Sequence, residues 1–183
     1  KMNHVFHRTP RQELPYAVGG DGVYIVDNKG QRYLDACGGA AVSCLGHSDE
    51  TVRRAIHEQV DKLAFVHSGF FTTDVMEALG GRLAALAPAG LDRVYLVSGG
   101  SEAMEAALKL TRQYFLEAGQ PDRVRIIARQ QSYHGNTLGA LATGGNLLRR
   151  APFAPLLMDA VRHIPACYPS RHRTEERRVG KGS

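Results

Sequence analysis

The chain has 183 residues, of which 43% are hydrophobic and 22% are charged, and its formal net charge is +5. This length suits one domain or most of one, and the apolar content is sufficient for a core. No apolar run approaches the roughly 18 residues of a membrane-spanning helix, and the N-terminal residues contain no apolar signal-peptide segment. The sequence therefore excludes a membrane-embedded class, and we expect no membrane partner.

The excess of positive charge is concentrated at the C-terminal end. Five of the 23 basic residues but only two of the 18 acidic residues lie in residues 171–183, so the rest of the chain carries a charge of only +2. We therefore expect no nucleic-acid partner. This basic tail resembles translated sequencing-adapter sequence, and both a non-native origin and a disordered basic tail remain open.

Cysteine usage is sparse. Cys37, Cys44 and Cys167 show no CxxC spacing, so the sequence predicts neither a disulfide framework nor a zinc site. We expect no metal and a reducing, cytoplasmic location.

The first predicted elements are a hairpin and a helix. Apolar residues flank residues 27–30, where Gly30 can supply the positive φ of a hairpin turn. A helix follows, capped by Ser48 or Asp49, and His47 in the preceding turn is expected to be structural. Its apolar face contains Val52, Ala55, Ile56, Val60 and Leu63.

A second helix is predicted before residue 88. Asp74 and Glu77 have the spacing of a capping box, and Pro88 follows the end of the pattern. The apolar stripe is formed by Met76, Leu79, Leu83 and Leu86. A change of character at residues 89–92 predicts a domain boundary there.

The next segment has the layout of a phosphate cradle. A short apolar strand at residues 94–97 is followed by the turn Ser-Gly-Gly-Ser and by a helix predicted over residues 101–117. Glycines permit the tight turn, and the first N–H groups of a helix have no partner within it. Together with the helix dipole these groups favour an anion, while Glu102 and Glu105 are expected to complement the dipole of this helix.

A second strand, predicted over residues 124–128, precedes the segment Ser-Tyr-His-Gly-Asn-Thr and a helix that begins near Asn136. Strand, helix and strand in this order predict an α/β fold with a parallel sheet. The ring of Tyr133 beside a phosphate cradle indicates a ligand that is both flat and phosphorylated.

These two segments resemble the class III (omega type) aminotransferases. The similarity also includes GVYIVDNKGQRYLD at residues 22–35 and CLGHSDETVRRAIHEQ at residues 44–59, and it covers roughly residues 15–170. The resemblance implies the cofactor pyridoxal 5'-phosphate (PLP). It also implies that cofactor-binding residues match the family's motifs, at Gly100, Ser101, Tyr133, His134 and Gly135.

The resemblance further implies transamination, in which an amino group passes from an amine or amino acid to a keto acid or aldehyde, and a homodimer. The family also contains aminomutases and a decarboxylase. Its catalytic lysine lies far downstream, and none of the five lysines here matches that position. We therefore assign no catalytic residue and expect an N-terminal fragment that is inactive alone.

The resemblance implies part of the type I PLP-dependent transferase fold. We predict an N-terminal segment over residues 1–90, the first part of the large parallel-sheet domain over 91–170, and the tail over 171–183.

Other readings remain open. The turn before Ala103 mimics the nucleophile elbow of an α/β-hydrolase, with Ser101 as nucleophile and with Asp159 and His163 in the right order. A non-catalytic remnant that binds only the PLP phosphate is a third reading. Residue by residue, Ser101 could be an N-cap, Tyr133 a core tyrosine and His134 a structural histidine.

Overall fold

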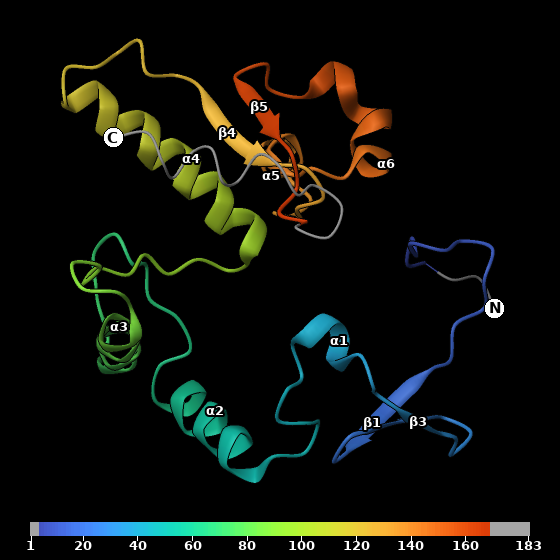
Figure 1. Cartoon of the computed structure of the whole chain (residues 1–183). Helices are drawn as coiled ribbons and strands as arrows, with labels where there is room; N and C mark the ends of the chain where they lie inside the picture. The colour runs from blue at the N-terminus through green and yellow to red at the C-terminus, as the bar shows by residue number, and fades with distance from the viewer. Residues whose placement is uncertain (1–3, 169–183) are drawn as a thin grey trace. The chain divides into compact units, whose positions relative to one another are not determined.

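The computed structural model describes residues 4–168, and the chain divides into two units, one ending at Leu79 and the next beginning at Gly80. Figure 1 shows the first unit in blue to green and the second in green to red. The division falls inside the helix α3 (Asp74–Leu86), before the boundary predicted at residues 89–92.

The first unit contains a three-stranded antiparallel sheet in the order β1-β2-β3 (Figure 1). Strands β2 (Tyr24–Asp27) and β3 (Arg32–Leu34) form the predicted hairpin, with Gly30 at φ +79°. Strand β1 (Ala17–Asp21) pairs with β2 and was not predicted, because its sequence AVGGD has little strand propensity.

Asp27 organises the hairpin turn. Its carboxylate Oδ1 accepts the N–H groups of Lys29 and Gln31, each at 2.9 Å, and the Tyr33 hydroxyl donates to Oδ2 at 3.0 Å. Desolvation alone would raise the pKa of Asp27, but these hydrogen bonds more than offset it and the pKa is lowered. The turn therefore depends on a buried carboxylate as well as on Gly30.

A left-handed turn follows the sheet. The short helical turn α1 (Gly38–Ala41) has positive φ at all four residues, including 65° at Ala40 and 66° at Ala41. This conformation costs about 1–2 kcal/mol for each residue that has a Cβ. The Asp35 carboxylate braces it, because Oδ1 accepts the Gly39 N–H and Oδ2 lies 2.9 Å from both Ser43 Oγ and His47 Nε2. His47 is therefore structural, as predicted.

Two amphipathic helices lie in the sequence between the left-handed turn and the predicted phosphate cradle. Helix α2 (Glu50–Lys62) is capped by Asp49, whose carboxylate accepts the Val52 N–H at 2.9 Å, as predicted. Helix α3 (Asp74–Leu86) is capped by Thr73 and not by Asp74, because the Thr73 hydroxyl accepts the Met76 N–H at 3.3 Å. Glu77 accepts instead from the Thr72 hydroxyl.

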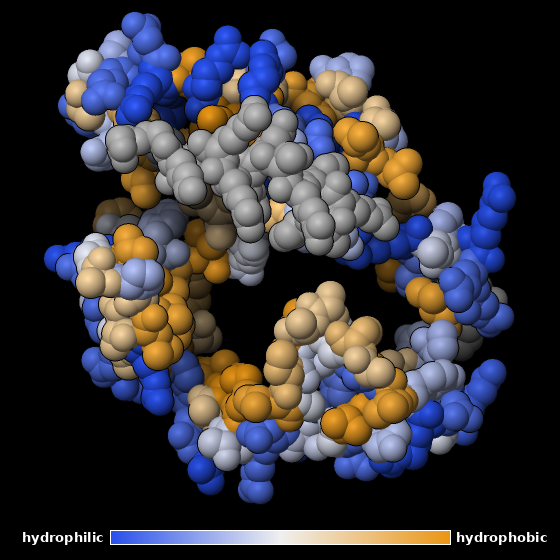
Figure 2. Space-filling view, viewed as in Figure 1, coloured by the Kyte–Doolittle hydropathy of each residue, from blue (hydrophilic) through white to orange (hydrophobic). Residues whose placement is uncertain are grey.

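Neither of these helices has a buried residue. Hydrophobic side chains lie at the surface over both (Figure 2, orange), including Val52, Ile56, Leu79 and Leu83. The predicted apolar faces exist, but no described element covers them.

The second unit is a small α/β layer. Strand β4 (Ile126–Arg129) pairs in parallel with β5 (Val161–Ile164), which confirms a parallel sheet, although β5 was not among the predicted strands. Between them lie α5 (Leu138–Thr143), α6 (Leu147–Arg150) and a 3-10 helix (Ala151–Leu156). Helix α4 (Gly100–Glu117) precedes the sheet and matches its prediction to within one residue.

The core of this unit is small. Ala128 of β4, Ala142 of α5 and Val161 of β5 pack together, with Ile126 and Leu157 partly buried against them. No large side chain among the described residues is fully buried. Only a small part of the hydrophobic content that predicts a core is therefore buried.

The strand predicted at residues 94–97 is not a strand. These residues have no ladder partner in the described part of the chain, and β4 pairs only with β5 there. A β-strand requires hydrogen bonds from a neighbouring strand, which local sequence cannot supply. The predicted tail at 171–183 lies outside the described residues.

Candidate cofactor site

The N-terminus of α4 is open. Its N-cap residue is Gly99, which has no side chain to accept an N–H group. The first backbone hydrogen bond runs from the Ala103 N–H to Gly99 O at 2.9 Å. Among the described residues, the N–H groups of Gly100, Ser101 and Glu102 have no acceptor. A Cβ at Gly99 or Gly100 would meet no atom within 4 Å, so an anion can approach these donors.

Ser101 joins this helix end to the loop after β4. Its hydroxyl donates to Asn136 Oδ1 at 2.9 Å and accepts the Asn136 N–H at 3.0 Å. Ser101 is therefore not an N-cap. Because a hydroxyl has a single proton, the Ser101 hydroxyl has no further hydrogen to donate once it donates to Asn136.

Gly135 lets the loop lie against the helix. Its φ is +129°, and a Cβ there would lie 2.5 Å from Ser101 Oγ and 3.0 Å from Ala140 Cβ. Only glycine suits both the conformation and the space.

Glu105 connects the same two elements one turn further along α4. Its Oε1 accepts the N–H groups of Gly139 and Ala140 at 2.9 and 3.2 Å. The expectation that Glu105 complements its own helix was wrong, since it caps α5 instead. Glu102 bonds the Ser98 N–H just before its own helix, at 2.9 Å.

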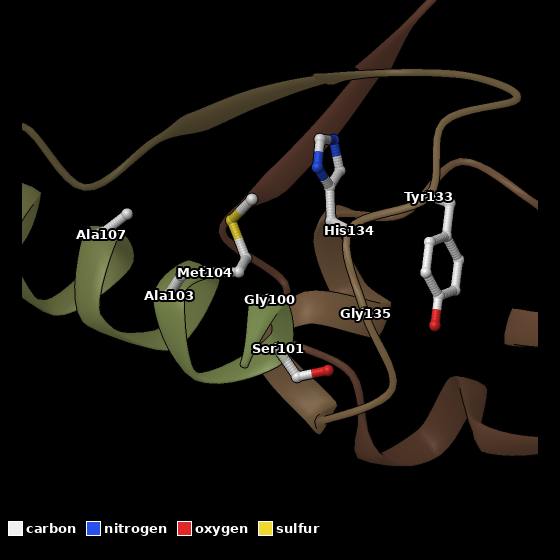
Figure 3. Close-up of a pocket in the computed structure, with 8 residues that line it drawn as sticks. All are labelled: Gly100, Ser101, Ala103, Met104, Ala107, Tyr133, His134 and Gly135. Carbon is white, nitrogen blue, oxygen red and sulfur yellow. The ribbon is translucent and has the colours of Figure 1, made fainter. Parts of the chain in front are cut away.

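The pocket at this junction has a volume of about 510 Å³, within the usual range for small-molecule sites. All five predicted cofactor-binding residues line it, from two segments about thirty residues apart in the sequence (Figure 3). The lining residues are Gly100, Ser101, Ala103, Met104, Ala107, Tyr133, His134 and Gly135.

Tyr133 and His134 leave the loop in opposite directions (Figure 3). Tyr133 is 65% exposed, so it is not a core tyrosine. The imidazole of His134 lies on the same side of the loop as Met104 and has no hydrogen-bond partner among the described residues. The ring available to a flat ligand is therefore that of Tyr133.

The hydrolase reading is wrong. Ser101 Oγ bonds to Asn136, while His163 Nε2 lies 3.0 Å from Gly144 O and 3.3 Å from Thr143 O. Within residues 4–168 no histidine hydrogen-bonds to Ser101, which a nucleophile elbow requires.

Within residues 4–168, no group of three or more His, Cys, Asp or Glu side chains could hold a metal ion. None of the helices described is both long enough and apolar enough to span a membrane.

Comparisons with known proteins agree on one family. The model of class-III aminotransferases matches residues 8–181. The chain is 39% identical over 173 residues to an uncharacterized aminotransferase of Schizosaccharomyces pombe, covering 94% of this chain and 38% of that protein. It is 41% identical over 154 residues to the adenosylmethionine-8-amino-7-oxononanoate aminotransferase of Nitratidesulfovibrio vulgaris, covering 81% and 28%.

Solved structures show the same fold. An (S)-enantioselective omega-transaminase from Thermomicrobium roseum superposes with a TM-score of 0.84 at 33% identity, over 98% of this chain and 42% of that one. A PLP-bound amine transaminase from an uncultivated Pseudomonas species gives 0.82 at 28% identity, over 98% and 43%. The chain thus spans less than half the length of these relatives and has part of the type I PLP-dependent transferase fold. It belongs to the class III aminotransferase family.

Proposed function

We propose that this chain supplies the PLP-binding part of a transaminase that moves an amino group from an amine or amino acid to a keto acid or aldehyde. The observation that carries the proposal is the open N-terminus of α4 in one pocket with the exposed ring of Tyr133. Family membership and the names of the relatives support the reaction class.

The residues present fit the cofactor. PLP is a flat pyridine with a phosphate group, and the N–H groups of Gly100 and Ser101 are donors without an internal acceptor. Open space at Gly99 and Gly100 leaves room for phosphate oxygens, and the dipole of the 18-residue helix favours their charge. Tyr133 offers a ring face, while His134 and Gly135 complete the wall.

Each residue then has a defined task. The N–H of Ser101 binds phosphate, whereas its hydroxyl holds Asn136 and so fixes the loop that carries Tyr133. PLP, when bound, accepts the amino group and stabilises the charge left at the carbon that loses a proton. We assign no proton-transferring residue in this chain, and the second candidate function is non-catalytic binding of the PLP phosphate.

We also propose a homodimer in the cytoplasm. The uncovered apolar faces of α2 and α3 support a further protein surface as partner. Cys37 and Cys44 are exposed free thiols, which supports a reducing compartment.

The test measures, by fluorescence titration, the affinities of pyridoxal phosphate and of pyridoxal for the 183-residue chain. We expect the phosphate to increase affinity at least about tenfold, since it alone reaches the α4 donors. Equal affinities would contradict the site.

Borohydride reduction and peptide mapping then locate any covalent adduct. We expect label to scatter over several amines and amino transfer to a keto acid to be absent. One lysine labelled to completion, with measurable transfer, would show a catalytic lysine within this chain, and Lys109 on α4 would be examined first.

A further inference from the structure

The ring of Tyr133 has one cation–π contact among the described residues. Cζ of Arg149 lies 5.0 Å from the ring centroid, within the distance of about 6 Å at which a guanidinium is attracted to an aromatic face. No described residue hydrogen-bonds its hydroxyl, and the ring is 65% exposed. Because most of the ring is exposed, the contact with Arg149 is the described interaction that favours one orientation of the ring.

The backbone brings these two residues together. The Gly145 N–H donates to Ser132 O at 3.0 Å, and the Gln131 N–H donates to Gly145 O at 3.2 Å. A Cβ at Gly145 would collide with the backbone of Arg129, so glycine is required for this close pairing. The segment that follows Gly145 thus begins beside the residue that precedes Tyr133.

Asn146 fixes the next step. It is the N-cap of α6, and its Oδ1 accepts the Arg149 N–H at 3.2 Å. This cap sets the backbone of Arg149 one turn after Gly145. No carboxylate among the described residues pairs with Arg149, so its guanidinium is available to the ring.

We propose that Arg149 is a positioning residue, which stacks on one face of Tyr133 and leaves the opposite face to the pyridine ring of the ligand. The proposal rests on the proposed PLP site. An aromatic ring has two faces, and a guanidinium that covers one of them also limits rotation of the ring. Arg149 acts through Tyr133 and contacts no phosphate.

The experiment uses the 183-residue chain and two probes, 4'-deoxypyridoxine 5'-phosphate, which has the ring and the phosphate but no aldehyde, and inorganic phosphate. The variants are Arg149→Gln, Arg149→Lys, Tyr133→Leu and the double variant Arg149→Gln/Tyr133→Leu. The control is Arg123→Gln, since Arg123 lies 4.7 Å from the Phe115 centroid in the same kind of contact away from the pocket.

We expect Arg149→Gln to weaken binding of the ring-bearing probe about threefold to tenfold, with partial rescue by Arg149→Lys. Inorganic phosphate should bind unchanged, and Arg149→Gln should have no further effect once Tyr133 is Leu. A loss of phosphate affinity in Arg149→Gln, or an undiminished effect without the ring, would overturn the positioning role. Normal binding of the ring-bearing probe by Arg149→Gln would overturn it as well.

A second measurement needs no ligand. In NMR spectra the Nε–H of Arg149 should be shifted upfield by the ring current of Tyr133, and the shift should disappear in Tyr133→Leu. Absence of the shift overturns the stacking itself. Failure of the unsubstituted chain to bind either probe, with the shift present, instead overturns the proposed cofactor site.

Discussion

The N-terminal unit and the start of α4 differ in whether side chains accept their backbone N–H groups. In the N-terminal unit, carboxylates accept them: Asp27 accepts the N–H groups of Lys29 and Gln31, and Asp49 accepts that of Val52. At α4 the N-cap is Gly99, and the first three N–H groups have no acceptor within residues 4–168. A closed donor stabilises the fold, whereas an open one is available to an external anion.

The contrast extends to α5, which lies beside the pocket. Glu105 accepts two of the first N–H groups of α5, whereas at α4 none of the first three N–H groups has an acceptor among the described residues. The difference supports the proposed binding site at α4, because a glycine stands at the N-cap, where a carboxylate would otherwise accept the N–H groups.

The largest effect is expected from closing α4. In Gly99→Asp the new carboxylate would occupy the N-cap, which the extended conformation (φ −171°) and the empty space permit. Two like charges 4 Å apart repel by about 4 kcal/mol at an effective dielectric constant of 20. After allowance for solvent screening we expect about a hundredfold loss of affinity for 4'-deoxypyridoxine 5'-phosphate, measured by fluorescence titration.

Gly99→Ser is the matched neutral variant, because serine caps without charge, and it should lose much less affinity. If Gly99→Asp binds like the unsubstituted chain, the phosphate does not lie at α4.

Gly135→Ala tests whether the open helix end needs its loop. The new Cβ would lie 2.5 Å from Ser101 Oγ at a φ of +129°. We expect a loss of about 1–3 kcal/mol in the free energy of local opening, measured by hydrogen exchange of the Asn136 N–H. Gly80→Ala, where nothing lies within 4 Å, is the control and should be neutral or stabilising. Unchanged protection at Asn136 would contradict the assigned contact.

Asp49→Ala removes the carboxylate that caps α2, so it makes the opposite change to Gly99→Asp. Loss of the bond to the Val52 N–H should reduce the stability of α2 by about 1 kcal/mol, measured by hydrogen exchange in its first turns. Binding of the ring-bearing probe should not change. An equal loss of binding would show that the two regions are not independent.

The smallest effect is expected from acid. Hydrogen bonds from Ser43, His47, Cys37 and Gly39, the first of them the largest, lower the pKa of Asp35 against desolvation, which raises it. A lowered folded pKa contributes stability above the ordinary carboxyl value of about 3.9 and loses it as the pH falls through the lowered value. Protection of the Gly39 N–H, relative to its intrinsic exchange rate at each pH, should therefore fall below about pH 4. In Asp35→Asn this pH dependence should disappear, and its persistence would assign it to another group.

Local patterns predicted the elements that carry their own signal. Helix α2 follows from the spacing of its apolar residues and from Asp49, and α4 from the glycine turn and the long helical segment. Five of the eight residues that line the pocket follow from two motifs matched to a family.

Contacts between distant residues were not predictable in the same way. The bond of Ser101 to Asn136 spans 35 positions, and Arg149 meets Tyr133 only because Gly145 packs against the loop. The lack of strand pairing at residues 94–97 in the described part of the chain, where a strand was predicted, depends likewise on surroundings that no local window contains. The same holds for the left-handed turn at Gly38–Ala41.

The two bridges from α4 to the loop have a consequence for ligand size. Ser101 and Glu105 stand one helical turn apart and bind residues 136 and 139–140, so the helix start and the loop bearing Tyr133 are held at a constant separation. A ligand must span that separation between its anionic group and its ring. Analogues with the linking carbon removed or one carbon added would satisfy one end of the site at the expense of the other, and the pocket would select by length even among molecules of equal charge.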